Sequence, residues 1–214
     1  MSELQSSAKR LFDILLALLA LAALLPLLLA IAALVKLTSK GPALYRQERV
    51  GQNGAPFVLL KFRTMVDGAE AQTGPKLSVA GDTRITPVGR VLRSCRLDEL
   101  PQLVNIVKGE MSLVGPRPER PYFVEQFAAK IPGYRDRHKV KPGLTGLAQV
   151  LGAYSTPAEQ KLAYDLAYIH RQSLWLDFSI IARTVPVLFK PGAARGVPEG
   201  CETMSSREQS CGLR

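Results

Sequence analysis

The chain has 214 residues, which is enough for one domain with an appendage and too few for two full domains. Lysine and arginine number 28 against 18 aspartates and glutamates, and the net charge of +10 indicates an anionic partner: nucleic acid, phospholipid headgroups or a polyphosphate. Three cysteines without metal-ligand spacing argue against a zinc protein and against a disulfide framework.

Residues 11–35 form an apolar run in which only Asp13 and Pro26 are not apolar. As a straight helix this run would reach about 37 Å, and no stripe of polar residues interrupts it, so we predict a membrane segment. A signal peptide fits less well, because the run is too long and no small-residue cleavage site follows Val35.

The topology of this segment has two alternatives. Basic residues flank it on both sides, so the positive-inside rule gives no orientation. Pro26, near the middle, removes a backbone hydrogen bond and predicts a kink. A kinked helix can still span the bilayer. The symmetric charge and the proline together favour a re-entrant helix whose ends both lie on the cytoplasmic face.

The stretch at residues 43–65 predicts two short strands around the turn Gln52-Asn53-Gly54. Lys61 and Arg63 alternate with Phe62, which predicts both charges on one face of an extended segment. That face is either simply solvated or part of an anion site. The following residues, 69–94, contain glycine and proline at intervals without a sustained period, and they predict loops and turns.

Residues 93–119 place the adjacent acids Asp98 and Glu99 between arginines, ahead of a Gly-Pro-Arg-Pro turn. Adjacent carboxylates can supply a nucleophile and a metal ligand, while guanidinium groups neutralise a pyrophosphate. The same acids also fit the start of a helix that Gly109 would close, with Asp98 as its N-cap. These residues alone do not decide between capping and catalysis.

The C-terminal part predicts a short helix ending near Lys130, a Gly-Leu-Thr-Gly turn at residues 143–146, and an amphipathic helix at residues 157–171. The apolar run at residues 174–190 fits either an interfacial helix or a buried one. Residues 191–214 are rich in glycine, serine and charge, and we predict a disordered tail.

Several motifs, taken in order, resemble the bacterial sugar transferase family, the monotopic polyprenyl-phosphate phosphoglycosyl transferases. The motifs are KRLFD at 9–13, SKGPALYRQERVG at 39–51, KFRTM at 61–65, DTRITPVGRVLR at 82–93, LDELPQLVNIVKGEMSLVGPRPE at 97–119 and KPGLTGLAQV at 141–150. The resemblance extends from residue 9 to about residue 184 and closes with a helix pattern around Tyr164, Asp165, Ser173 and Asp177.

The resemblance implies an α/β fold class: a small, mainly helical catalytic domain with a short β-hairpin or sheet, an N-terminal re-entrant membrane helix and interfacial amphipathic helices. The expected divisions are a membrane helix over residues 1–38, a catalytic domain at the cytoplasmic face of the bacterial inner membrane over residues 39–190, and the tail. Its expected partners are a UDP-sugar, a polyprenyl phosphate and the bilayer, without nucleic acid; a homodimer is left open.

The implied reaction moves a sugar 1-phosphate from a UDP-sugar to polyprenyl phosphate and releases UMP, which would initiate the assembly of a cell-surface glycan. By the resemblance, Asp98 is the nucleophile that forms a phosphosugar-aspartyl intermediate. Glu99 either coordinates the metal or activates the lipid phosphate, and the acid pair holds Mg²⁺. An alternative enzymatic mechanism is direct attack by the lipid phosphate, with Asp98 serving only the metal.

The resemblance also implies substrate contacts. Arg117, between Pro116 and Pro118, is expected to hold a donor phosphate. The remaining expected contacts are Lys61, Arg63, Arg90, Arg93, Thr145 and Gln149. For Thr145 and Gln149 a turn residue and a structural amide are equally good descriptions, and Asp177 matches a family position that also fits a structural role.

This chain departs from the family pattern at Leu25, where a serine is frequent, at Arg96, where the pattern has serine, and at Ala153, where many members carry a basic residue. The last departure leaves one donor-phosphate contact and the sugar open. A different class of protein, a membrane-anchored basic module that binds anionic lipid or nucleic acid, would need neither the acid pair nor the Pro-Arg-Pro turn.

Overall fold

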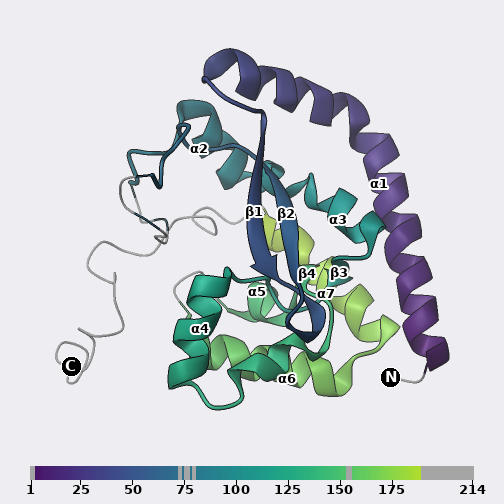
Figure 1. The fold of residues 1–214 in the computed structure, drawn as a ribbon. Coiled ribbons are helices and arrows are strands. Elements are labelled where there is room, and N and C mark those ends of the chain that lie inside the picture. Colours follow the sequence, from purple (N-terminus) through teal and green to yellow (C-terminus); the bar gives the residue numbers. More distant parts are fainter. Residues whose placement is uncertain (1–2, 72–73, 75–77, 79–80, 153–155, 189–214) are drawn as a thin grey trace.

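The computed structural model describes residues 3–71, 74, 78, 81–152 and 156–188. The first element, α1 (Glu3–Thr38), is a single 36-residue helix that contains Pro26. It rises along one side of the body and then bends across its top, so that it has two arms (Figure 1). A proline at this position accounts for a bend, because its ring breaks the i→i−4 hydrogen-bond ladder.

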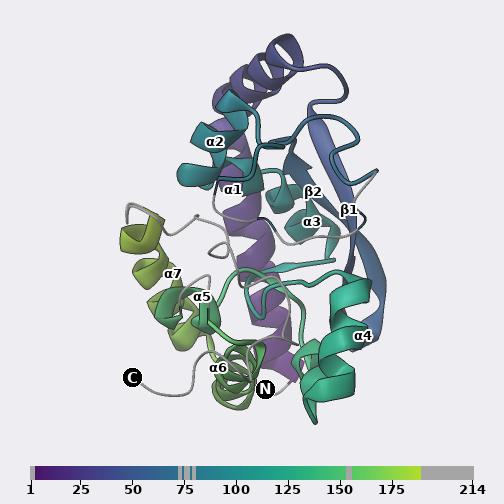
Figure 2. The same ribbon diagram turned by 90° about the vertical axis from the view of Figure 1, so that its left-hand side faces the viewer.

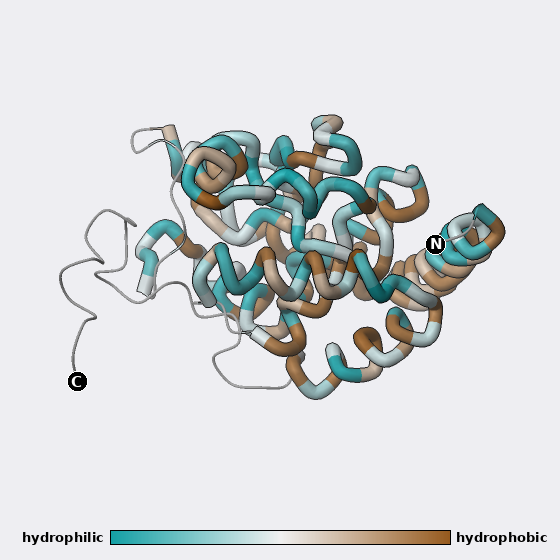
Figure 3. Tube along the Cα trace, turned by 90° about the horizontal axis from the view of Figure 1, so that it is seen from below, coloured by the Kyte–Doolittle hydropathy of each residue, from teal (hydrophilic) through white to brown (hydrophobic). Residues whose placement is uncertain are grey.

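The buried side chains of α1 lie on one stripe. In the first arm they are Lys9, Asp13 and Ala17, and in the second Ile31 and Val35. Each lies four residues after the last within its arm, which places it on the same face of the helix. Many of the other α1 side chains are exposed leucines. In Figure 3 the turns of α1, to one side of the body, are largely tan and brown, which marks hydrophobic residues.

A β-hairpin lies beside the first arm of α1. Strands β1 (Leu44–Val50) and β2 (Pro56–Phe62) pair antiparallel, with Tyr45 opposite Lys61 and Arg49 opposite Phe57. The turn, η1 (Gln52–Gly54), uses Asn53 at φ 55°. Two strands around a Gln-Asn-Gly turn are therefore confirmed, because asparagine and glycine tolerate the left-handed backbone that such a turn requires.

The segment predicted as loops contains a helix, α2 (Pro87–Ser94). Its start follows ordinary capping rules: the Thr86 hydroxyl accepts a hydrogen bond from the Gly89 N–H at 2.9 Å, and Pro87 occupies the first turn. The prediction of loops was wrong here because the helix has only two turns and too few periods to reveal its apolar face. A Cβ at Gly89 would collide with the Thr64 backbone, so glycine lets α2 lie directly on the chain that leaves β2.

After α2 the chain makes a short 3₁₀ turn, η2 (Leu97–Glu99), and then α3 (Gln102–Lys108). Gly109 ends α3 at φ 92° and donates its N–H to the Asn105 carbonyl at 3.1 Å, which confirms the predicted C-terminal glycine. Helix α3 packs between β2 and the first arm of α1, and its buried Leu103 and Ile106 join the main apolar core.

Two further strands pair in parallel: β3 (Ser112–Val114) with β4 (Gly143–Thr145). The Gly-Leu-Thr-Gly segment, predicted as a turn, therefore forms a strand. The error has a physical reason, since strand pairing across thirty residues leaves no local pattern. Glycine is needed for the close approach: a Cβ at Gly143 would collide with the backbone of Gly115.

Helices complete the fold: α4 (Pro121–Lys130), η3 (Tyr134–Lys139), α5 (Leu147–Leu151), α6 (Ala158–Arg171) and α7 (Leu174–Leu188). Figure 2 shows α5, α6 and α7 on the side of the body away from the hairpin. The short helix predicted to end near Lys130 and the helix predicted at residues 157–171 are confirmed. The fold is a small, mainly helical α/β arrangement with two two-stranded sheets; the predicted tail at 191–214 lies outside the described residues.

Helix α7 has one buried face, which agrees with the buried alternative; the interfacial alternative stays a prediction. Asp177 and Ile180 are fully buried against the body, whereas Trp175 is 82% exposed and Phe178 50% exposed. One face of the helix therefore belongs to the core and the opposite face presents large aromatic side chains. That division is typical of a helix that lies at an apolar–polar boundary.

The first arm of α1 is fixed to the body by buried polar groups. The Lys9 ammonium lies 2.6 Å from Asp177, and Asp13 accepts hydrogen bonds from the Ser112 hydroxyl at 2.7 Å and the Leu113 N–H at 3.2 Å. The structure therefore assigns Asp177 a structural role. Because buried charges are costly unless paired, these contacts also set the rotation of α1 about its axis.

Candidate functional site

The acid pair lies in η2, at the junction of α2 and α3. Arg96 adopts the left-handed backbone at φ 57°, ψ 17°, which reverses the chain so that both acids turn inward. Asp98 is 7% exposed and Glu99 8% exposed. The N-cap of α3 is Pro101, without a side-chain capping bond, so the prediction of Asp98 as helix N-cap was wrong.

Glu99 is held by two basic side chains from distant parts of the chain. Lys61, near the end of β2, lies 3.2 Å from Glu99 Oε1. The Arg117 guanidinium donates to both carboxylate oxygens, one of them at 3.2 Å. Burial alone would raise the pKa of Glu99, but the charges of Arg117 and Lys61 outweigh burial and hold that pKa well below its usual value.

Asp98 has the opposite electrostatic environment. Burial raises the pKa of its carboxyl above the ordinary 3.8, and the negative charge of Glu99 raises it further, against the charges of Lys61, Arg93 and Arg117. The two adjacent carboxyls thus differ: Glu99 is a clamped, ionised group, and Asp98 is a poorly solvated one. A poorly solvated carboxylate beside several cations is suited to attack an electrophilic phosphorus.

The Pro-Arg-Pro turn is held rigidly by its backbone. Pro116 and Pro118 are buried, and each carbonyl from residue 116 to residue 119 accepts one hydrogen bond. The donors, in that order, are the Gly143 N–H at 2.9 Å, Arg137 at 3.0 Å, Arg49 at 3.2 Å and the Val50 N–H at 3.0 Å. The Arg117 side chain therefore reaches Glu99 from a fixed base, which lowers the entropic cost of ordering it.

Arg137, which sequence reasoning missed, anchors this turn from a buried position. Its guanidinium pairs with Asp165 of α6 at 2.7 Å and donates to the Tyr134 hydroxyl at 2.6 Å. Burial lowers the pKa of Arg137, but the charge of Asp165 and the Tyr134 hydroxyl outweigh burial, so that the pKa is raised and the guanidinium stays charged. The family pattern around Asp165 was the available signal, because an acid within it can have an ion-pair partner. The pattern does not show that this partner is Arg137.

The two arginines of α2 that were predicted to contact substrate, Arg90 and Arg93, lie in different environments. Arg93 donates to the Thr64 and Ser78 hydroxyls, each at 2.8 Å, and its charge acts on Asp98. Arg90 is exposed on the same helix. Arg93 thus borders the acid pair, and the substrate contact expected of Arg90 stays a prediction.

Arg63 lies apart from Lys61, contrary to the expectation of a shared charged face. Strand β2 ends at Phe62, so the alternation does not continue, and the Arg63 guanidinium turns to Ser39 and Lys40 at the end of α1. Its Ser39 contacts measure 3.0 Å to the carbonyl and 2.9 Å to the hydroxyl. In this structure Arg63 connects the hairpin to the residues that follow α1.

Thr145 and Gln149 hydrogen-bond within the fold. The Thr145 hydroxyl lies 2.7 Å from that of Thr184 on α7, and the Gln149 amide donates to the Leu144 carbonyl at 3.0 Å. These contacts agree with the structural descriptions left open for both residues, and the donor contacts expected of them stay predictions.

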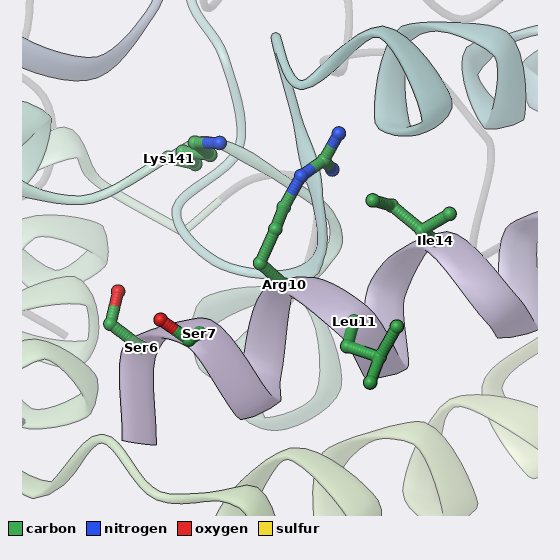
Figure 4. A pocket seen from close by; sticks show the side chains of 6 residues that line it. All are labelled: Ser6, Ser7, Arg10, Leu11, Ile14 and Lys141. Atoms are coloured by element: carbon green, nitrogen blue, oxygen red, sulfur yellow. The ribbon is translucent and has the colours of Figure 1, made fainter. Parts of the chain in front are cut away.

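A hollow of about 430 Å³ lies beside the first turns of α1, away from the acid pair. Figure 4 shows Ser6, Ser7, Arg10, Leu11, Ile14 and Lys141 around it. No carboxylate is among these lining residues, and the Arg10 guanidinium is occupied by the Ile106 and Val107 carbonyls at 2.6 and 2.9 Å. Those bonds satisfy the C-terminal carbonyls of α3. The hollow is therefore separate from the acid pair.

A buried acid pair lies between a lysine and an arginine, in a fold that also carries a long apolar helix. These features together are typical of a phosphate-handling site beside a membrane. The comparison with known proteins agrees: the chain belongs to the bacterial sugar transferase family, whose model matches residues 4–191.

Three relatives illustrate the similarity. The UDP-N-acetylgalactosamine-undecaprenyl-phosphate N-acetylgalactosaminephosphotransferase of Aeromonas hydrophila is 44% identical over 91% of this chain and 46% of its own length. The UDP-glucose:undecaprenyl-phosphate glucose-1-phosphate transferase of Caulobacter vibrioides is 48% identical over 84% of this chain and 69% of its own. The exopolysaccharide production protein ExoY of Sinorhizobium fredii is 40% identical, with 85% of each chain covered. This chain thus spans less than half of the Aeromonas relative.

Proposed function

We propose that this protein transfers a sugar 1-phosphate from a UDP-sugar to polyprenyl phosphate, giving a polyprenyl diphosphate sugar and UMP. The observation that carries the proposal is the electrostatic difference within the acid pair: Glu99 is ionised between Lys61 and Arg117, while Asp98 beside it is desolvated. The printed activities of the Aeromonas and Caulobacter relatives support the same reaction class.

The reaction has two steps. In the first, a carboxylate oxygen of Asp98 attacks the sugar-bearing phosphorus, the bond from that phosphorus to the UMP oxygen breaks, and UMP leaves with the electron pair. In the second, an oxygen of polyprenyl phosphate attacks the same phosphorus and the bond to Asp98 breaks. The aspartate returns unchanged, and phosphorus keeps its sugar throughout.

In this mechanism Arg117 and Lys61 bind Glu99 and also stabilise charge on the substrate phosphates. Each is bonded to Glu99, so each is held at the site before any substrate arrives. Preorganised cations stabilise charge that develops on the leaving phosphate without reorganising during the reaction. Arg93, fixed by Thr64 and Ser78, adds a third positive charge at the border of the pair.

We propose that the acid pair, Asp98 and Glu99, holds a magnesium ion. Mg²⁺ in such sites needs only one or two carboxylates, because substrate phosphates and water complete its six ligands. Within the described ranges no group of three or more acids, histidines or cysteines forms a metal cluster, and Asp98 with Glu99 is the pair we assign. When bound, the ion would offset pyrophosphate charge.

We place the catalytic body at the cytoplasmic face of the bacterial inner membrane. Helix α1 is long and apolar enough to cross a bilayer, and only 11% of its most apolar window is buried in the fold. Exposed leucines along both arms would be unfavourable in water. The bend at Pro26 supports a re-entrant course, with residues 1–38 inserted and residues 39–190 forming the catalytic unit.

The test is UMP release by the purified protein, with a panel of UDP-sugars. With the right donor we expect Mg²⁺-dependent release of one UMP per enzyme without acceptor, and turnover once polyprenyl phosphate is added. Asp98→Asn should reduce both by about a thousandfold or more. Asp136→Asn, at a half-exposed acid paired with Lys139, is the matched control and should retain activity.

Three results would change the proposal. Full activity of Asp98→Asn would remove its role as nucleophile. UMP release only when both substrates are bound would favour direct attack by the lipid phosphate. No UMP from any donor would overturn the enzymatic function and favour an anchored basic module.

A further inference from the structure

A small cavity beside the clamped carboxylate has an unusual lining. Its walls are Arg49, Leu59, Lys61, Gln102, Arg117 and Pro118. The hairpin brings the first three together, because Arg49 opposes Phe57 in the register and alternation then puts Leu59 and Lys61 on the same face. Gln102, the first residue of α3, is 2% exposed and completes the lining from the other side.

Two buried donors at this cavity lack an acceptor. Among the described residues, neither Arg49 Nε nor Gln102 Nε2 has a hydrogen-bond partner. The other Arg49 nitrogens bind the Pro118 carbonyl and Gln47, so the arginine itself is firmly placed. A buried donor without an acceptor destabilises the fold, so two of them at one cavity need an explanation.

The cavity has room for one oxygen atom, and its chemistry favours an anionic one. Its volume is about 10 Å³, near the space that a single water requires. Water would accept from the donors but would also present two hydrogens to a lining that includes three cationic side chains. A phosphate oxygen only accepts hydrogen bonds, and its negative charge would face three cationic side chains. Lys61 and Arg117 also pair with Glu99, and Arg49 with Glu119 at 3.7 Å.

We propose that Arg49 and Gln102 form a binding site for a phosphate oxygen of a substrate, between Lys61 and Arg117. The inference rests on the proposed function for the identity of the substrates, but the binding itself does not depend on turnover. The oxygen belongs either to the nucleotide donor or to the lipid phosphate, and both offer the same chemistry.

The test measures binding and stability together. Inorganic phosphate, UMP and a short-chain polyprenyl phosphate are titrated into the full chain by calorimetry, and the melting temperature is recorded without ligand. For Gln102→Met we expect about a tenfold rise in Kd for the ligand whose oxygen occupies the cavity, as expected for loss of one bond to a charged acceptor. Its melting temperature should stay equal or rise, because the variant removes an unsatisfied buried donor.

A second variant and a control sharpen the test. Gln102→Glu places a carboxylate among Arg49, Lys61 and Arg117, and should exclude phosphate more strongly than the methionine does. Gln160→Met, at an exposed glutamine on α6, should leave each Kd unchanged.

The outcomes identify which substrate supplies the oxygen, and they test the cavity separately from the proposed function. A weaker affinity for UMP alone assigns the oxygen to the donor, and a weaker affinity for polyprenyl phosphate alone assigns it to the acceptor. Wild-type affinity of Gln102→Met for all three ligands, or a lower melting temperature with unchanged affinity, would overturn the site. Neither result would affect UMP release by the wild-type protein, which tests the function.

Discussion

Two adjacent carboxyls acquire opposite properties because their neighbours differ. Glu99 points to Lys61 and Arg117, which keep it ionised, whereas Asp98 is buried beside a like charge that raises its pKa. The left-handed residue Arg96 makes this possible, since it turns the chain so that both acids face inward. A reaction that needs one fixed anion and one reactive carboxylate can therefore use consecutive residues.

The raised pKa of Asp98 predicts the pH dependence of the first step. A nucleophilic carboxylate must be deprotonated, so the UMP burst should fall with decreasing pH through the pKa of Asp98. Since that pKa is raised, the acid limb should lie above 3.8. Single-turnover UMP release measured across pH checks this. A limb at or below 3.8 would contradict the burial of a reactive Asp98.

The same shift predicts the stability of Asp98→Asn. The folded-state pKa is raised above its unfolded value, so at neutral pH ionisation of Asp98 opposes folding. Asparagine removes that charge at nearly the same volume, and the melting temperature should stay equal or rise while turnover is lost. Thermal unfolding at pH 7 is the measurement. A marked fall would mean that the carboxylate stabilises the fold.

At the scale of elements, the first arm of α1 is positioned by charge as well as by apolar packing. Lys9 and Asp13 are one turn apart on the buried stripe, and they meet Asp177 of α7 and Ser112 of β3. Two separate elements, α7 and β3, thus meet one face of α1. An apolar helix without such contacts could rotate or slide against the body at little cost.

Breaking this connection should destabilise the whole body. Lys9→Met leaves Asp177 buried without its cation, which costs about 3–5 kcal/mol for a buried pair that loses one partner. We expect a melting temperature lower by roughly 10 °C, measured in detergent. Lys36→Met, at an exposed lysine of the same helix, should change it little. Equal melting temperatures for the two variants would show that the buried pair contributes nothing.

Elements with a complete local signal could be predicted from the sequence. The apolar run of α1, the Asn53-Gly54 turn and the Gly109 terminus each follow from a few consecutive residues. Strand β4 could not, because its partner β3 lies thirty residues earlier. Helix α2 was missed although Thr86 and Pro87 mark its start, since two turns give too few periods to count.

The residues of the site also divide into those that the sequence predicted and those that it did not. Asp98, Glu99, Lys61 and Arg117 were expected, and the structure brings them together. Arg49 and Gln102 were not expected, because only the hairpin register and the start of α3 place them beside one cavity. Arg63 was expected near Lys61 and lies elsewhere, because the extended backbone ends one residue earlier.

At the scale of the whole molecule, the full chain has a net charge of +10, which bears on the proposed position at a bilayer. The exposed leucines of both α1 arms and the exposed aromatics of α7 are apolar, while the rest of the chain is basic. Basic side chains near an anionic leaflet are favourable, by about 1 kcal/mol each close to the surface. Both contributions agree with the position at the cytoplasmic leaflet that we propose.

The re-entrant course makes a prediction about labelling. In a variant without its native cysteines, Glu3→Cys and Lys40→Cys mark the two ends of α1, where both native side chains are exposed. On the proposed re-entrant course the chain returns to the side it entered, so an impermeant maleimide should label neither site in intact spheroplasts and both in inverted vesicles. Leu25→Cys, within the apolar part, should react poorly in either preparation. Labelling of Glu3→Cys from the periplasmic side would instead establish a spanning helix, and the bend at Pro26 would then be an ordinary kink within the bilayer.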